Sequence, residues 1–265
     1  MDFLKILLST LFLPILPFII CGFIVGLFEK LFMKLTGKFG RGVVATSSFI
    51  GTPVHELGHA IMCIPFGHKI KKICLWNPKA PNGVLGYVKH TYNKKNPWHK
   101  LGCLFISMGP IIMGLGVVTL TMLLCFGDTI RGYYDIASSV GTDAGGVANI
   151  FSEGIRIIPS AIADTSSPTW AKIVGGLIIL CVCMHINLSP ADIKNSLGAI
   201  PVYSLICLVV SLSMFIIGID ASAYSAALLS WCWICLALYM VVFAGVVVLL
   251  AIALVCFIIG KLIGR

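Results

Sequence analysis

The chain has 265 residues, of which 58% are hydrophobic and only 11% are charged. Soluble domains carry roughly a quarter charged residues, so this composition excludes an ordinary soluble protein. The net charge of +9 does not indicate a nucleic-acid-binding protein, because the basic residues cluster beside apolar runs and no recognition motif accompanies them. The composition predicts an integral membrane protein surrounded by a lipid bilayer.

Several apolar runs approach or exceed the roughly 20 residues that a membrane-spanning helix needs. We expect six spans, over residues 4–27, 43–66, 101–126, 169–190, 199–218 and 223–260. Between the first two, residues 28–42 alternate Phe, Leu and Met with Lys and Arg, which is typical of an interfacial amphipathic helix. The last run is long enough to be either one protruding helix or a broken one.

These elements divide the chain into three regions. Residues 1–42 hold the first span and the amphipathic helix, residues 43–200 hold a core of three spans, and residues 201–265 hold the C-terminal spans. Six spans put both termini on the same face as loop 67–100, and that face then carries twelve of the nineteen basic residues. The positive-inside rule assigns it to the cytoplasm, and the short loops favour a bacterial plasma membrane.

Loop 67–100 differs from the other connections. Turn-forming residues, among them Pro81, Asn82 and Gly83, precede a β-prone alternation over residues 87–92, and this order predicts a hairpin. Loop 127–168 is rich in Gly, Ser and Asp around a weakly amphipathic stretch and is too short for an independent domain. The expected fold is an all-α polytopic membrane protein of about six transmembrane helices with one small β-hairpin.

The eleven cysteines fall mostly inside apolar runs, where a cysteine behaves as a small hydrophobic residue. We therefore expect no disulfide framework. Cys232 and Cys235 form a C-x-x-C pattern, but they lie in a long apolar segment between tryptophans, which favours lipid-packed helix over a redox pair.

Residues 55–59 form an H-E-x-x-H motif. On a helix, His55 and His59 lie one turn apart on one face, where both imidazoles reach one Zn²⁺ ion. Glu56 lies beside them, where it can take a proton from a metal-bound water. The alternative is a pair of core histidines and a buried glutamate satisfied by neighbours. A membrane disfavours that alternative, because hydrocarbon offers an unpaired glutamate no cheap partner.

The sequence also predicts where the helix of this motif begins. Thr52 can cap it and Pro53 can occupy its first turn, a position that proline favours. Residues 44–52, rich in Ser, Thr and Gly, would then be irregular.

A catalytic zinc site usually takes three protein ligands and leaves the fourth position to water. Asp192 is our first choice for the third ligand, because it follows the fourth span and Pro190, which should reset the helix and turn the carboxylate inward. A simple helix cap is the alternative role for Asp192. His185 is the competing third ligand, with a hydrogen-bonded core histidine as its alternative role.

Three motifs together resemble the site-2 protease family of intramembrane zinc metalloproteases. They are the H-E-x-x-H at residues 55–59, the Gly109-Pro110 pair in the next span, and the segment from Asn187 to Asp192. The resemblance covers residues 43–200 and includes the hairpin loop after the zinc helix. It also departs from the family, since Ile193 stands where a glycine is usual, Ile111 stands where an asparagine is common, and no PDZ-sized insert is present.

The resemblance implies roles for individual residues. His55, His59 and Asp192 would bind one zinc ion, Glu56 would activate the zinc-bound water, and Asn187 would orient the backbone of a substrate. The implied function is zinc-dependent endopeptidase activity on a peptide bond of a single-pass membrane protein. The strand edges of loop 67–100 could hold the unwound substrate. Nothing in the sequence indicates an oligomeric state.

Two other functions remain as alternatives. Membrane peptidases that process prenylated proteins also carry H-E-x-x-H, but they need a downstream glutamate, and Glu153 lies in a loop expected on the external face. A non-catalytic membrane-embedded regulator or chaperone with a vestigial zinc site would have no need of Glu56. A transporter is not indicated, because matching broken segments in two halves are missing.

Overall fold

The computed structural model describes residues 1–79, 84–139 and 144–262. Within them the chain is largely helical, with one antiparallel pair of strands. The elements in chain order are α1 (Asp2–Phe12), α2 (Leu16–Thr36), α3 (Lys38–Cys63), β1 (Lys69–Cys74), β2 (Tyr87–Thr91), α4 (Pro97–Cys125), α5 (Gly127–Ser139), α6 (Ala144–Ala163), α7 (Thr169–Cys183), α8 (Pro190–Leu197), α9 (Ile200–Ile217) and α10 (Ala221–Leu262).

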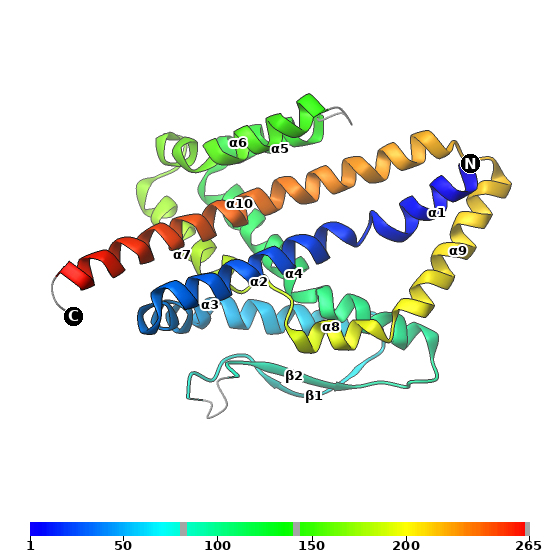
Figure 1. The fold of residues 1–265 in the computed structure, drawn as a ribbon, viewed down its shortest axis with the longest axis horizontal. Coiled ribbons are helices and arrows are strands. Elements are labelled where there is room, and N and C mark those ends of the chain that lie inside the picture. Colours follow the sequence, from blue (N-terminus) through cyan, green and yellow to red (C-terminus); the bar gives the residue numbers. More distant parts are fainter. Residues whose placement is uncertain (80–83, 140–143, 263–265) are drawn as a thin grey trace.

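The long helix α10 sets the shape of the molecule. It runs along most of the long axis, and α1 and α2 pack against it (Figure 1). The N-terminus lies beside the junction of α9 and α10, and the last described residue, Leu262, ends α10 at the opposite end of the molecule (Figure 1). The β1–β2 hairpin forms one edge of the molecule and the α5–α6 pair forms the opposite edge (Figure 1).

Fewer candidate membrane spans are found among the described residues than the sequence predicts. In the part of the chain that the structure describes, four helical segments are long and apolar enough to cross a membrane: Asp2–Thr36, Pro97–Cys125, Ile200–Ile217 and Ala221–Ile259. Thr169–Cys183 is apolar but shorter. The helical fold with one hairpin is confirmed, whereas six spans are not. The expected span over 43–66 lies in α3, whose Gly, Ser, Thr and His residues lower its apolar character.

Two local predictions near the N-terminus are wrong. Residues 28–36 continue α2 and do not form a separate interfacial helix, and the chain turns at Gly37, which has a φ of +57°. The helix of the zinc motif then begins at Lys38, so Pro53 lies inside α3 and residues 44–52 are helical. Glycine adopts this positive φ at little cost, so the chain turns at Gly37 and the helix does not start at Thr52 and Pro53.

The structure shows how the segments 223–260 and 127–168 fold. The run expected as one or two helices is a single helix, α10. The segment 127–168 contains two helices, α5 and α6, and the weakly amphipathic stretch that the sequence shows there lies within α6.

The predicted hairpin is confirmed. Strand β1 pairs with β2 from Lys69 opposite Thr91 to Cys74 opposite Tyr87, with an irregularity between Ile70 and Lys72. The expected turn residues Pro81, Asn82 and Gly83 lie outside the described residues.

Close packing holds the hairpin and α4 against α3. A Cβ atom on Gly86 would lie 2.7 Å from Cγ2 of Thr52 and 2.8 Å from Cγ of Glu56. A Cβ atom on Gly58 would lie 2.4 Å from the carbonyl oxygen of Gly109, and one on Gly109 would lie 2.4 Å from that of Gly58. Small residues let helices approach backbone to backbone in membrane proteins. The H-E-x-x-H segment is therefore enclosed by α4 on one side and the hairpin on another.

Candidate metal centre

Three of the residues singled out from the sequence meet at one point. His55 and His59 come from α3 and Asp192 from the first turn of α8, and their potential ligand atoms all lie within 4.8 Å of one another. Nε2 of His59 lies 3.4 Å from Oδ1 of Asp192. Both side chains are largely buried, at 12% and 8% exposed. These three residues could hold a metal ion.

Backbone carbonyl groups orient both histidine rings. Nδ1 of His55 donates to the carbonyl oxygen of His185 at 2.8 Å, and Nδ1 of His59 donates to that of Ile106 at 2.8 Å. A carbonyl oxygen only accepts, so each neutral ring carries its hydrogen on Nδ1 and a lone pair on Nε2. Histidines that ligate metals usually make this second hydrogen bond. Both rings therefore have the tautomer and the orientation that a metal ligand requires.

The two roles that the sequence left open for Asp192, helix cap and potential metal ligand, are compatible in the structure. Its Oδ2 accepts hydrogen bonds from the backbone N–H of Ser189 at 3.0 Å and from the Ser189 hydroxyl at 2.6 Å, and its own N–H donates to that hydroxyl. This reciprocal pattern is a capping box at the start of α8. The other oxygen, Oδ1, faces His59. Capping therefore fixes the carboxylate in the orientation that a ligand needs.

Helix α4 also holds this segment in place. The Ser107 hydroxyl donates to the backbone carbonyl of Asp192 at 2.8 Å. Ser107 precedes the Gly109-Pro110 pair, so the three motifs that carry the resemblance contact one another in the structure.

His185 takes a role that sequence reasoning missed. Its ring nitrogen Nε2 lies 3.2 Å from the hydroxyl of Ser47, and its ring lies so close to Gly51 that a Cβ there would be 2.1 Å from Cδ2. The ring does not belong to the group formed by His55, His59 and Asp192. Its backbone carbonyl contributes instead, by orienting His55. A backbone contact leaves no signature in the side-chain pattern of a sequence.

Glu56 lies in a cavity of about 550 Å³ together with the three potential ligands. Glu56 is buried, with 7% of its surface exposed. The hairpin, α4 and α8 complete the wall, with Val84, Gly86, Tyr87, Val88, His90, Tyr92, Cys103, Ile106, Ser107, Ser189, Pro190, Ala191 and Asn195. A buried carboxyl group, three potential metal ligands and an open space thus occur together.

His90 lies on the strand side of this cavity. Burial lowers the pKa of its imidazole, and the nearby rings of His68 and His59 lower it further. The ring is therefore neutral near pH 7 and adds no positive charge to the cavity.

Two other residues from the sequence argument lie elsewhere. Asn187 donates through Nδ2 to Oε2 of Glu29 on α2, and the cavity lining described above does not include it. Its role in substrate binding stays a prediction. Glu153 lies on α6, at the edge opposite the hairpin, and forms an ion pair with Arg156 at 3.3 Å (Figure 1). This position does not favour the prenyl-peptidase alternative.

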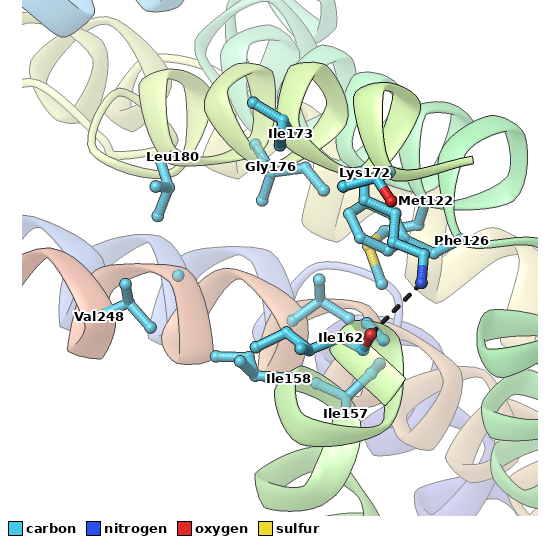
Figure 2. A pocket seen from close by; sticks show the side chains of 15 residues that line it. Met122, Phe126, Ile157, Ile158, Ile162, Lys172, Ile173, Gly176, Leu180 and Val248 are labelled. Atoms are coloured by element: carbon cyan, nitrogen blue, oxygen red, sulfur yellow. Dashed lines mark hydrogen bonds between the residues drawn. The ribbon is translucent and has the colours of Figure 1, made fainter. Parts of the chain in front are cut away.

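A second cavity, of about 400 Å³, lies between α4, α6, α7 and α10. Figure 2 shows its lining of aliphatic and aromatic side chains, with one charged residue, Lys172. The Lys172 ammonium donates to the backbone carbonyls of Ile162 and Asp164. This cavity contains no metal-ligand group or general base among its described lining residues, so hydrolytic chemistry is not expected there.

No protein-family model matches the chain, and neither a curated protein nor a solved structure does. The donor atoms of the site indicate which metal ion it could hold. Two imidazole nitrogens and one carboxylate oxygen are a set that zinc accepts in catalytic centres, where three protein ligands leave one position open. The donor atoms and their fixed orientation fit a zinc ion.

Proposed function

We propose that the protein is a multi-pass, zinc-dependent intramembrane endopeptidase, similar in its chemistry to site-2 proteases. Its substrate would be a single-pass membrane protein. The observation that carries this proposal is the convergence of His55, His59 and Asp192 at a cavity that also contains Glu56. Ionisable groups are costly at membrane depth, so a cluster of four, of which His55, His59 and Asp192 are held by hydrogen bonds, favours a functional site.

Zinc bound to this set would supply Lewis-acid chemistry, polarising the scissile carbonyl and making water more acidic. Glu56 takes the proton from the attacking water and delivers it to the nitrogen of the leaving amine. The C–N bond breaks to give a carboxylic acid and an amine, and the acid then passes its proton to the amine, so that a carboxylate and an ammonium group are the final products. Glu56 returns to its starting protonation state when the amine leaves.

The hairpin supports substrate binding in this proposal. Tyr87 and Val88 of β2 line the same cavity as Glu56. A peptide bond must be freed from helical hydrogen bonds before water can attack it, and a strand edge offers replacement partners for the unwound backbone. Residues 84–92 would therefore hold the substrate in extended form beside Glu56.

The test is a cleavage assay with purified protein in detergent. A panel of peptides with single transmembrane segments is incubated with the wild type, and the products are identified by mass spectrometry. Glu56→Gln should abolish cleavage while it retains bound zinc, and Glu153→Gln is the matched control that keeps activity. Removal of zinc by a chelator should stop cleavage and added zinc should restore it. Equal cleavage by Glu56→Gln and wild type would contradict the proposal.

A further inference from the structure

A second cluster of metal-ligand side chains lies at the end of α3. Cys63 is the last residue of that helix, His68 follows in the turn before β1, and His90 lies on β2. Sγ of Cys63 and one ring nitrogen of each histidine lie within 4.8 Å of one another. Cys63 and His68 are buried, at 0% and 6% exposed. From the sequence this cysteine is a hydrophobic residue of an apolar run, and no sequence motif connects it with the two histidines.

The orientation of His68 resembles that of the two histidines on α3. Its Nε2 donates to the backbone carbonyl of His99 at 2.7 Å, so its Nδ1 carries the lone pair. That nitrogen accepts a hydrogen bond from Nδ1 of His90 at 2.9 Å, and a metal ion between the two rings would take the place of this hydrogen. A backbone carbonyl thus fixes one nitrogen of the ring and leaves the other directed into the cluster, as metal-ligating histidines require.

The surroundings hold the rings in this position. The Tyr92 ring stacks on His68 with centroids 4.6 Å apart and an interplanar angle of 12°. A Cβ atom on Gly102 would lie 3.0 Å from Nε2 of His68, so this glycine leaves the space that the ring occupies. Nδ1 of the neighbouring His99 accepts a hydrogen bond from the backbone N–H of Asn93, which puts the hydrogen of that ring on Nε2. His99 is therefore not a further ligand.

We propose that Cys63, His68 and His90 form a second metal site, which takes a zinc ion. One thiolate and two imidazoles are donors that zinc prefers in proteins, with a fourth position left for a non-protein ligand. Cys63 binds as the thiolate and releases its proton to solvent on metal binding. Metal binding at this site does not rest on the proposed function, since none of its three ligands is a potential ligand of the first site.

The position of the second site indicates what it does. Cys63 follows His59 by four residues, so the two sites lie about one helical turn apart, or about 6 Å along the axis of α3. His90 also lines the cavity that contains Glu56. A metal ion there would join the end of α3 to strand β2, and so hold the hairpin over the cavity. Its role is to position the hairpin, and the chemistry remains at the first site.

Cobalt(II) titration distinguishes the two sites. Cobalt replaces zinc in such sites, and a cysteine ligand adds a thiolate-to-cobalt charge-transfer band in the near ultraviolet. Only the second site contains a thiolate. We therefore expect metal-free wild-type protein in detergent to bind two equivalents of cobalt and to show the band. Cys63→Ser should bind one equivalent and lack the band, and His68→Gln should lose the same equivalent.

Two controls separate this result from misfolding and from the first site. Cys103→Ala removes another buried cysteine of the same region and should keep both equivalents and the band. His59→Ala should lose one equivalent and keep the band, whether or not the protein is a peptidase. Gel filtration shows whether each variant is folded. A wild type that binds cobalt without the band, or a band that survives in Cys63→Ser and disappears in Cys103→Ala, would overturn the assignment.

Discussion

The two cavities described above are similar in size and opposite in chemistry. The cavity between α3, α4, α8 and the hairpin contains histidines, carboxylates and hydroxyls, whereas the cavity between α4, α6, α7 and α10 is almost entirely aliphatic (Figure 2). Both lie between helices of a largely apolar chain. An apolar cavity between apolar helices does not by itself indicate a function, because the shapes of the packed side chains can leave such a space. Buried polar side chains that are each held by a specific hydrogen bond are costly, and they indicate a function.

The polar cavity depends on backbone atoms as much as on side chains. Carbonyl groups orient His55 and His59, a capping box orients Asp192, and two glycines bring α3 against α4. In the apolar cavity, by contrast, Gly176 has nothing within 4 Å of the position of a Cβ atom. Substitutions around the polar cavity should therefore lower stability or metal binding, whereas substitutions around the apolar cavity should be tolerated.

The largest effect is expected for Glu56→Gln. The amide keeps the size of the side chain but cannot accept the proton of water, so the rate of cleavage should fall by about 10²–10⁴-fold, the typical contribution of a general base. Zinc content should not change, since Glu56 is not one of the three ligands. Steady-state kinetics on any peptide that the wild type cleaves gives the rate, and elemental analysis gives the zinc.

Gly109→Ala should destabilise the fold. The new Cβ would meet the carbonyl oxygen of Gly58 at 2.4 Å, and this overpacking should lower the free energy of unfolding by about 3 kcal/mol. Gly116→Ala on the same helix is the matched control, because nothing lies within 4 Å of its Cβ position. Thermal unfolding in detergent measures both. Equal stability of the two variants would contradict the backbone contact between α3 and α4.

Ser189→Ala should weaken metal binding without removing it. The variant loses the hydroxyl that donates to Oδ2 of Asp192, and outer hydrogen-bond partners of metal ligands contribute about 10–100-fold to affinity. Loss of the cap should also cost about 1 kcal/mol of stability. Titration against a zinc chelator measures the affinity. Ser196→Ala, on the outer part of the same helix, should leave it unchanged.

The smallest effect is expected in the apolar cavity. Gly176→Ala adds one methyl group at a position with no atom within 4 Å, so the free energy of unfolding should not fall. Zinc content and cleavage should equal those of the wild type. A loss of zinc in this variant would show that the apolar cavity is coupled to the polar one, which would contradict the expected difference between them.

Much of the candidate site follows from sequence spacing. His55 and His59 had to share a helix face, and Asp192 was expected to turn inward after Pro190, which is where it lies. What spacing could not give are the backbone partners, such as the carbonyl of His185, because carbonyl groups are the same in every residue. The second cluster was missed for a related reason. Cys63, His68 and His90 come together only through the pairing of β1 with β2.

The start of α3 shows the limit of local signals. Thr52 and Pro53 are a good capping pair, yet the helix begins at Lys38 because Gly37 turns the chain there. Packing against α4 and α7 continues the helix through the proline. Six spans are not confirmed, because the Gly, Ser, Thr and His residues of α3 lower its apolar character and the apolar helix α7 is short.

The zinc content of purified protein tests the central claim most directly. Elemental analysis is carried out on the wild type, His59→Ala, Asp192→Ala and His185→Ala, each purified with zinc present. We predict that His59→Ala and Asp192→Ala each hold one zinc ion fewer per chain than the wild type, whereas His185→Ala, which keeps its backbone carbonyl, holds as much. Wild-type protein without zinc, or an Asp192→Ala variant with the full wild-type amount, would contradict the account.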